Sequence, residues 1–254
     1  MKALLTRRAL VGSVASSAGL LLSGCDALGD NAQFRGLLKL GEAGNYALHR
    51  SLTDRTALAK EFRPEQRSPI FRANGTRMPD GDAYARHVAT QFVDWRLVID
   101  GLVARPQALP LAAVKAMPAR AQITRHDCVE GWSAIGKWTG VPLKALLDQA
   151  SVSPRAKYII FHCADPQSNG TMYYESVDMI DALHPQTMLA WALNDTLLPV
   201  PNGAPLRLRV ERQLGYKHAK YVQRIEAVAS LVGHYGGKGG YWEDAAGYEW
   251  YAGA

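Results

Sequence analysis

The sequence predicts a domain that mixes strands with helices and is rich in strands. Residues 95–100 alternate apolar and polar side chains, which is the period of a half-buried strand, and they run into an Asp100-Gly101 turn. The run 157–163 has the composition of a second strand. Pro142 opens an amphipathic helix between them, and hydrophobic residues make up 48% of the chain, enough for one substantial core.

The first 24 residues predict a signal peptide. Lys2, Arg7 and Arg8 form a positive start, and residues 9–22 form an apolar stretch that is too short and too weakly hydrophobic for a membrane span. The run 6–10 resembles a twin-arginine signal, the export route of proteins that are loaded with a cofactor before they cross the membrane. An ordinary secretory start also often contains two arginines, so both routes stay open.

The end of this leader, Leu22-Ser23-Gly24-Cys25, fits a bacterial lipobox at every position. We therefore expect Cys25 to be lipidated and to become the first residue of the mature protein. Each buried acyl methylene contributes about 0.8 kcal/mol to membrane binding. The alternative is a plain signal peptide in which this cysteine is incidental.

Net charge argues against a nucleic-acid partner. The full chain carries +6, but three of these positive charges belong to the leader, which contains no acidic residue, so about +3 remains. The sequence also contains no long basic face with interleaved aromatic residues, the usual mark of nucleic-acid binding.

Three regions follow from composition. Residues 1–24 are the leader, residues 25–67 a tether and a segment packed on the domain surface, and residues 68–254 the main domain. The tether mixes glycines with short apolar pieces and shows no sustained period, although a short helix is expected over 48–59. The main domain begins with an Asn74-Gly75 turn whose amides can face a ligand.

The first half of the main domain predicts strands and two helices. A hairpin partner for 95–100 is expected at 102–104, and a short helix at 110–118 is bracketed by prolines. A short strand begins near Ile123 and leads to Cys128. After Pro142 one helix face is apolar and backs the cysteine loop against the core, formed by Leu143, Leu146, Leu147 and Ala150.

The second half continues the same pattern. The strand 157–163 ends in a polar loop, 164–170, which we expect to border the site. Residues 173–185 predict a strand end, a helix cap near Ser176 and one or two helical turns that stop before a proline. Residues 188–193 are apolar and lead into a turn.

A basic block follows. Arg207 and Arg209 alternate with apolar residues, so both guanidinium groups are expected on one strand face, where they can bind a phosphate. Gly215 lets the backbone approach a ligand closely, and further donors follow it, Lys217, His218 and Lys220. A solvated basic strand face explains the block equally well if it is taken alone. The glycine-rich and aromatic tail after residue 227 predicts packing over the domain, with a lid or a docking surface as the alternative.

Cys128 stands among His126, Asp127, Glu130 and two tryptophans. A thiolate is a soft anionic ligand that binds transition metals well. Taken alone, a buried free cysteine would be the simpler interpretation, and a disulfide with Cys163 is the other alternative in an oxidising compartment.

The run Cys128-Val-Glu-Gly-Trp-Ser, followed by Trp138-x-Gly-Val-Pro-Leu, resembles the molybdenum-ligating segment of the sulfite oxidase superfamily. It is most similar to the branch of the periplasmic methionine sulfoxide reductase catalytic subunits, whose motif begins Cys-Val-Glu-Ala-Trp. A second block, 201–222, also agrees with the family. Over about 68–228 the resemblance implies the superfamily's α+β, strand-rich molybdopterin-binding domain and a molybdenum-molybdopterin cofactor.

The resemblance also implies roles for single residues. Cys128 would ligate the metal, and Glu130 is the candidate for orienting the substrate or a proton. The positions that match the family's cofactor contacts are Asn74, Cys128, Cys163, Asn202, Arg207, Lys217, His218, Ala219 and Lys220. Relatives carry a threonine near Cys163, and an aromatic and acidic pair where Arg77 and Met78 stand here. Superfamily members that bind oxyanions have arginines after the cysteine, whereas Val129 follows here, which disfavours an anionic substrate.

The resemblance thus predicts an exported, molybdopterin-dependent oxidoreductase that transfers an oxygen atom with two electrons and reduces a neutral S-oxide or N-oxide. The alternatives are a sulfite-type dehydrogenase and a non-catalytic lipoprotein that keeps the fold as a binding module. The chain has no haem-attachment motif and no iron-sulfur cysteines. We therefore expect a membrane haem protein or a periplasmic cytochrome as electron partner, and a periplasmic location with membrane contact through the lipid anchor.

Overall fold

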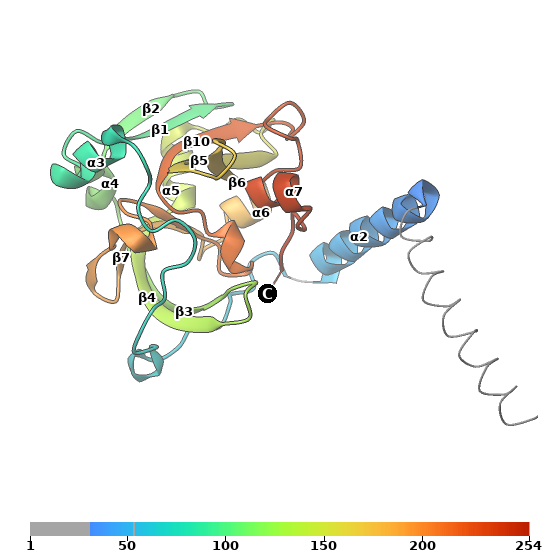
Figure 1. The fold of residues 1–254 in the computed structure, drawn as a ribbon, viewed down its shortest axis with the longest axis horizontal. Coiled ribbons are helices and arrows are strands. Elements are labelled where there is room, and N and C mark those ends of the chain that lie inside the picture. Colours follow the sequence, from blue (N-terminus) through green and yellow to red (C-terminus); the bar gives the residue numbers. More distant parts are fainter. Residues whose placement is uncertain (1–30, 53, 254) are drawn as a thin grey trace, which may run out of the picture. The chain divides into compact units, whose positions relative to one another are not determined.

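The structure is a computed structural model that describes residues 31–52 and 54–253 (Figure 1). The chain divides into two compact units, which end and begin at Asp54 and Arg55. The expected signal peptide and the expected lipidation site, Cys25, lie outside the described residues. Among the helices of the described ranges, none combines the length and the apolar character that crossing a membrane requires.

The described part of the first unit is one helix, α2 (Ala32–Leu52). Its first turn is capped by the side chain of Asn31, whose Oδ1 accepts hydrogen bonds from the backbone N–H groups of Gln33 and Phe34 at 2.9 and 3.1 Å. The bounds expected for this helix, 48–59, are wrong, because it begins at Ala32 and ends at Leu52. Glycines within the helix, which each lower helix propensity by about 1 kcal/mol, obscure its period in the sequence.

The second unit contains two sheets. The first is five-stranded, and only its β1 and β10 pair is parallel. Its strands, in spatial order, are β2 (Gln107–Pro110), β1 (Arg96–Gly101), β10 (Val222–Val228), β5 (Tyr158–Pro166) and β6 (Met172–Asp178). The second sheet is antiparallel and consists of β3 (Arg120–Asp127), β4 (Ser133–Pro142), β7 (Met188–Leu193), β8 (Thr196–Leu197) and β9 (Arg207–Arg209), which pairs with β7.

Short helices connect these strands. They are α3 (Asp82–Ala89), α4 (Leu111–Ala116), α5 (Leu143–Ala150), α6 (Met179–Ala182) and α7 (Tyr241–Ala246), with the 3₁₀ turns η1 (Pro64–Gln66), η2 (Val200–Asn202) and η3 (Gly215–Lys217). The predicted mixed α+β, strand-rich fold class is therefore confirmed. The segment before residue 68 also packs on the second sheet, because Phe62 N–H donates to the carbonyl of Ile123 at 2.8 Å.

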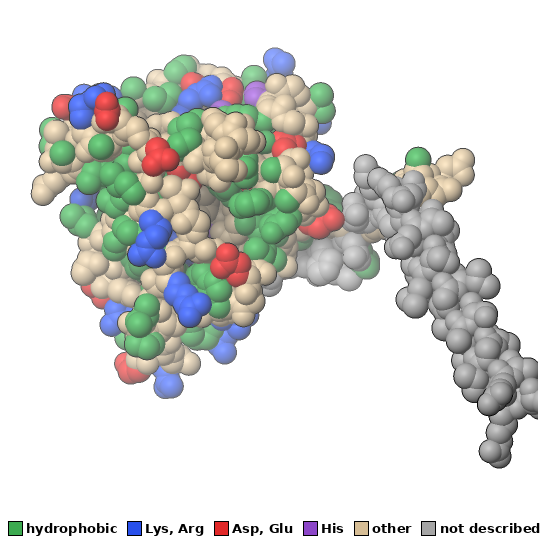
Figure 2. Space-filling model, in the orientation of Figure 1, with side chains coloured by type: hydrophobic (Ala, Val, Ile, Leu, Met, Phe, Trp, Pro, Cys, Tyr) green, Lys and Arg blue, Asp and Glu red, His purple; other side chains and the backbone are tan. Residues whose placement is uncertain are grey.

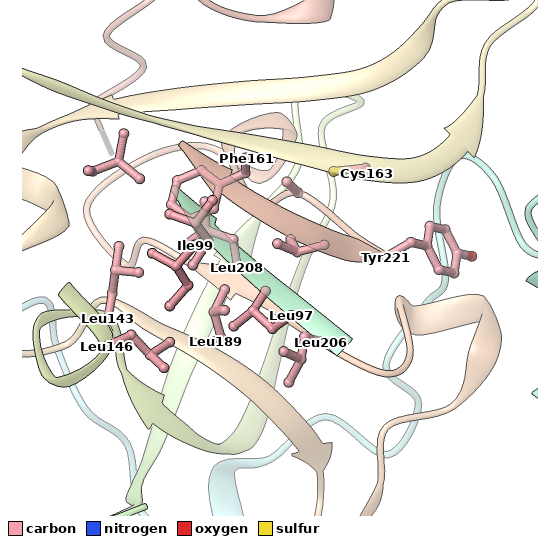
Figure 3. Close-up of a cluster of buried hydrophobic side chains, with 14 of the residues drawn as sticks. Leu97, Ile99, Leu143, Leu146, Phe161, Cys163, Leu189, Leu206, Leu208 and Tyr221 are labelled. Atoms are coloured by element: carbon pink, nitrogen blue, oxygen red, sulfur yellow. The ribbon is translucent and has the colours of Figure 1, made fainter. Parts of the chain in front are cut away.

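The core joins the two sheets through side chains that alternate along the strands (Figure 3). Burial of these apolar side chains is the main favourable contribution to folding. The predicted apolar face of α5 is confirmed, because all four of its members are buried and Pro142 stands at the N-cap. Core members from different elements include Leu97, Ile99, Leu143, Leu146, Phe161, Leu189, Leu206 and Leu208.

One local expectation is wrong and another is shifted. The antiparallel partner of β1 is β2, whereas residues 102–104, expected as its hairpin partner, follow the turn at Gly101, and Val103 forms an isolated bridge with Val152. The helix cap expected near Ser176 is Asp178, two residues later, whose Oδ1 accepts from the N–H of Asp181 at 2.8 Å, and α6 ends before Pro185 as expected. Between Cys128 and α5 lie the ten residues of β4, so the cysteine belongs to the hairpin of β3 and β4.

Candidate functional site

A pocket of about 230 Å³ lies where the ends of both sheets meet. Its walls come from segments far apart in the sequence, between residue 74 and residue 248. On the face shown in Figure 2, basic and acidic side chains are interspersed with apolar ones. The lining residues are Asn74, Gly75, Thr76, His126, Cys128, Val129, Glu130, Asp165, Gln167, Tyr173, Arg207, Gly215, Tyr216, His218, Ala219, Lys220, Trp242 and Tyr248.

Cys128 occupies the tip of the hairpin formed by β3 and β4. The last strand pair is Asp127 with Ser133, whose Oγ donates to the carboxylate at 2.5 Å. Beyond it the Cys128 N–H donates to the carbonyl of Trp132 at 2.9 Å, and Gly131, with a φ of 82°, completes the turn. The hairpin therefore fixes the backbone of the cysteine, whose side chain is free and partly exposed.

The Cys128 thiol receives a hydrogen bond from Asn74. The Asn74 Nδ2 donates to Sγ at 3.3 Å, while its Oδ1 accepts from the Gly75 N–H at 2.8 Å, which fixes the orientation of the amide. The hydrogen bond ties the sulfur to Asn74, and both residues line the same pocket.

Lys220 holds the loop that carries Asn74. Its Nζ donates to the carbonyls of Asn74 at 2.6 Å, of Pro201 at 3.1 Å, and of Thr76. The hydroxyl of Tyr221 donates to the same Thr76 carbonyl at 2.8 Å. Because the ammonium has three donors and all three are used within the protein, Lys220 contributes charge and position to the pocket.

Arg207 lies buried in the pocket wall, and its guanidinium group is incompletely hydrogen-bonded. Its Nη1 donates to the carbonyl of Asn202 at 3.2 Å, and the guanidinium stacks over Trp138 at 5.3 Å, but its buried Nε has no hydrogen-bond partner. Burial, and next the neighbouring Arg209, lower the pKa of Arg207 to about 9. Burial and Arg207 likewise lower the pKa of Lys220 to about 7. An anion in this pocket would relieve both effects.

Two histidines, His126 and His218, line the pocket beside Arg207 and are neutral. Burial, followed by the charges of Arg207 and Arg209, lowers the pKa values of His126 and His218 well below the usual range. Arg209 Nη1 donates to His126 Nδ1 at 3.0 Å, so the His126 proton is placed on Nε2. Arg209 is itself paired with Glu211 at 2.6 Å and does not line the pocket, so the two arginines do not share one ligand face as expected.

The acidic side of the pocket contains Asp165 and Glu130. Burial raises the pKa of Asp165 to about 7, against hydrogen bonds that include one from Gln167 at 3.2 Å. Glu130 lies at the hairpin tip, where its carboxylate accepts from Trp132 Nε1 at 3.2 Å. Asp165 can therefore change protonation near neutral pH at the pocket wall.

The structure brings seven of the expected site residues to this pocket and three elsewhere. Cys163 is buried in the core and borders a separate cavity of about 420 Å³, and burial raises the pKa of its thiol well above the usual range. Asn202 lies behind Arg207. Lys217 is fully buried between Glu175 and Glu243 and points away from the pocket that its neighbours line. The seven at the pocket are Asn74, Cys128, Glu130, Arg207, His218, Ala219 and Lys220.

Several lining residues were not singled out from the sequence. Asp165 lies in the segment that was expected to border the site, and Trp242 and Tyr248 come from the aromatic tail, but nothing in either segment indicated which residue faces the ligand. Tyr173 carried no signal of its own, although its hydroxyl donates to the carbonyl of Tyr216 at 2.7 Å across the pocket wall. These positions depend on contacts between distant segments.

The pocket suits an anionic group attached to a soft metal. The unpaired Arg207 Nε supplies a buried donor, and the thiol of Cys128 supplies a soft ligand. Gly215 lets its own segment approach the cysteine hairpin closely at the same wall, because a Cβ there would lie 2.6 Å from His126 Nε2 and would clash with it. These features together fit a large anionic cofactor better than they fit a packed core.

Comparison with known proteins points to the same chemistry. Residues 85–235 match the family model described as oxidoreductase molybdopterin binding domain. A protein of Azospira oryzae whose name describes it as a protein-methionine-sulfoxide reductase subunit, YedZ1, is 37% identical over 255 residues, which cover 98% of this chain and 88% of that protein.

Two further relatives carry the name protein-methionine-sulfoxide reductase catalytic subunit MsrP. The one of Xanthomonas campestris is 37% identical and that of Xanthomonas axonopodis 36% identical, each over 147 residues, or 54% of this chain and 46% of the relative. The match therefore spans about half the length of each MsrP protein. Among solved structures, the sulfane dehydrogenase SoxCD of Paracoccus pantotrophus is similar at a TM-score of 0.49 with 25% identity, over 54% of this chain and 39% of that one.

Proposed function

The chain belongs to the family of oxidoreductases with a molybdopterin-binding domain, and from this premise we propose that it reduces a neutral S-oxide by two-electron oxygen-atom transfer. It is a molybdenum enzyme with a molybdenum-molybdopterin cofactor. The names of its relatives favour methionine sulfoxide as the S-oxide.

One observation carries the proposal: the Cys128 thiol faces the pocket and accepts a hydrogen bond from the Asn74 amide at 3.3 Å. In the proposal this sulfur ligates the metal. The pterin and its phosphate would be held by Asn74, Arg207, His218, Ala219 and Lys220, which all line the pocket, and the carbonyl of Asn202 would orient Arg207. Cys163 and Lys217 are left out of this shell, because neither lines the pocket.

The residues of this chain bind, orient and supply protons. When bound, the cofactor would supply the redox-active metal for the oxygen-atom transfer, and the two electrons would come from the external donor. Reduction of a sulfoxide consumes two electrons and two protons and yields a sulfide and water. Asp165 and Glu130 are the proposed proton carriers, since both line the pocket and burial raises the pKa of Asp165 to about 7.

Location and electron supply are part of the same proposal. Residues 1–24 would direct export, Cys25 would carry the lipid, residues 25–67 would tether the domain, and residues 68–254 would form the periplasmic enzyme. A membrane haem protein or a periplasmic cytochrome would deliver the electrons. This partner would be excluded if turnover in reconstituted membranes were the same with and without every such donor.

The experiment uses the full chain, produced in a host that makes molybdopterin. Elemental analysis should find about one molybdenum per chain, and a reduced viologen dye should be oxidised on addition of methionine sulfoxide. Sulfite with an electron acceptor is tested in parallel. Turnover of sulfite alone would show a sulfite-type dehydrogenase, and a folded chain without molybdenum would show a binding module; either result contradicts the proposal.

A further inference from the structure

The helix α2 exposes large apolar side chains along one side. Leu37, Leu40 and Leu48 are 62%, 70% and 53% exposed, and Phe34 is half-buried. An α-helix turns by about 100° for each residue, so these four positions fall within about one third of its circumference. They are called here the apolar face of α2.

The charged residues of α2 lie on its other side. Residues 32–52 contain three basic residues, Arg35, Lys39 and Arg50, and one acidic residue, Glu42. By helical spacing all four positions lie opposite the apolar face, where the Arg50 guanidinium carbon is 5.5 Å from the ring centroid of Tyr46. The average hydrophobicity of α2 is low although its apolar residues gather on one side. This combination is typical of helices that lie in a membrane interface.

The apolar face of α2 has no second element to cover it within its own unit. In the described part of the first unit, α2 is the only helix or strand. Large apolar side chains are usually buried, and several of them exposed along one face mark an interaction surface. The face therefore requires an occupant from outside this unit.

Two glycines in the middle of the helix favour lipid as this occupant. Gly41 and Gly44 fall by spacing on the apolar face of α2, and a Cβ added to either would meet no atom within 4 Å. In a pair of helices, side chains of one helix fill the spaces of the other, so two positions without side chains would leave voids in the shared core. Acyl chains are fluid and fill such spaces, so a bilayer suits this face better than a second copy of the helix does.

The position of α2 in the chain favours the same occupant. The helix begins at residue 32, seven positions after Cys25, which is proposed above to carry a lipid. Seven extended residues span at most about 25 Å. A lipid at Cys25 would therefore keep the start of α2 close to the bilayer surface. Only this step rests on the proposed lipidation; the apolar face and the charge of α2 do not depend on it.

We propose that α2 lies in the interface of a membrane that contains anionic phospholipids, with its apolar face among the acyl chains and its basic residues toward the headgroups. Binding through α2 alone is reversible and is lost on washing, because stable anchoring takes two signals. With the lipid as the second signal, α2 would hold the enzyme at the membrane, where the proposed haem partner would deliver electrons.

The test uses the mature chain, residues 25–254, made without the leader and with Cys25→Ser, so that neither leader nor lipid contributes. Sedimentation measures its binding to vesicles of phosphatidylglycerol mixed with phosphatidylcholine, and to vesicles of phosphatidylcholine alone. We expect binding to the anionic vesicles to be tighter by about tenfold and to weaken as salt rises from about 0.1 M to about 1 M. Neither molybdenum nor turnover enters this measurement, so its failure is distinct from failure of the proposed function.

Two variants of this chain assign the binding to one side of the helix. Leu37→Gln combined with Leu48→Gln should weaken binding to the anionic vesicles by about tenfold or more, because two apolar side chains are lost from the contact. The matched control Tyr46→Gln makes the same kind of change on the opposite side, and should leave binding within about twofold.

Three results would overturn the proposal: unchanged binding of the double variant, equal binding to the two kinds of vesicle, or no binding to either. In the last case the molecular mass in solution shows what covers the face instead. A dimer that dissociates in the double variant would show a second copy, and a monomer would show that the chain covers the face itself.

Discussion

Arg207 and Arg209 stand two residues apart on β9 and are both buried, yet their surroundings differ. Arg209 pairs with Glu211 at 2.6 Å and serves the fold. Arg207 forms no ion pair with a carboxylate of the described residues, and its Nε lacks a hydrogen-bond partner. A buried cation in this state is unfavourable unless a ligand completes it. Arg207 is therefore the side chain whose placement makes most sense for an anionic cofactor.

This contrast predicts opposite effects of the same substitution. Arg207→Met should stabilise the cofactor-free chain by about 1–3 kcal/mol, since it removes an unpaired buried charge, while lowering the molybdenum retained on purification. The matched control Arg209→Met should destabilise the chain by about 3–5 kcal/mol, because Glu211 is left buried and unpaired. Urea unfolding and elemental analysis measure both quantities. Equal destabilisation by the two variants would contradict the assignment.

Asp165 gives the pocket a pH dependence. Its pKa is about 7 in the folded protein and 3.8 in an unstructured chain. Between these values the folded protein holds a proton that the unfolded chain has released, so stability from this group is full at low pH and falls as pH rises from about 4 to about 7. The asparagine in Asp165→Asn cannot ionise, so the stability of this variant should not decrease over this pH range through this group.

The measurement is urea unfolding of the cofactor-free wild type and Asp165→Asn at pH 4.5 and pH 7.5. The difference in free energy of unfolding should shift in favour of the variant at the higher pH, by at most about 1.4 kcal/mol for each pH unit crossed. A difference that stays constant over this range would show that Asp165 is already ionised at pH 4.5.

At the level of single residues, motif and chemistry selected Cys128, Asn74 and Arg207, and all three line the same pocket. Lys217 was misplaced for a physical reason. Residues 217, 218 and 220 lie in and after the turn η3, where consecutive side chains point in different directions, and no period in the sequence reports which of them reaches the ligand. Its partners Glu175 and Glu243 lie 42 and 26 residues away.

Two elements meet closely at the cysteine hairpin and at η3. Gly215 at the start of η3 lies against the end of β3, so that a Cβ would stand 2.6 Å from His126 Nε2 and 3.2 Å from the carbonyl oxygen of Asp127. Glycine is required here because any side chain would clash with these atoms. Gly215 and His126 both line the pocket, so their close approach limits its width at this point.

Gly215→Ala should therefore destabilise the protein by about 1–3 kcal/mol through overpacking and should also lower molybdenum content. The control Gly170→Ala places a Cβ in open space at a φ of 79°, outside the pocket lining, and should cause only the strain of a left-handed residue, about 1 kcal/mol. Thermal unfolding and elemental analysis check both. Full molybdenum occupancy in Gly215→Ala would refute a role for this close approach.

The strands that carry strong alternation and the proline-started helix α5 were predictable, because each has a local pattern. The errors fall where a local pattern competes with tertiary contacts. The glycines of α2 masked its helical period. The strand β1 pairs in parallel with β10, more than a hundred residues later in the chain, and no local pattern indicates this pairing. The adjacent residues 102–104 were therefore wrongly expected to be its hairpin partner. Strand pairing of this kind is decided by the whole core.

For the whole molecule, the pocket exists only when both sheets are assembled. Its lining begins at Asn74 and ends at Tyr248, and the C-terminal segment is joined to η3 by a hydrogen bond from the Tyr216 hydroxyl to the carbonyl of Glu249 at 2.5 Å. The fold class could be predicted from composition and from the resemblance to the family. The position of the aromatic tail could not, since the sequence favoured packing over the domain and did not indicate which rings line the pocket, Trp242 and Tyr248.

The proposed lipidation of Cys25 predicts where the protein is found in the cell. Cys25→Ser should move the protein from the membrane fraction to the soluble periplasmic fraction without changing the activity of the purified enzyme, because the proposed lipid chain would be lost and the pocket would be untouched. Fractionation with labelled palmitate measures this. Replacing Arg7 and Arg8 by lysine should instead keep the protein in the cytoplasm. Unlabelled wild type in the soluble fraction would refute the lipoprotein assignment.

The central claim is that the Cys128 sulfur is a metal ligand. X-ray absorption at the molybdenum edge counts the sulfur atoms bound to the metal, in wild type and in Cys128→Ser. The account predicts one fewer sulfur neighbour in the variant, loss of sulfoxide reduction and an unchanged thermal unfolding transition of the cofactor-free chain. An identical sulfur count in the two proteins would contradict it.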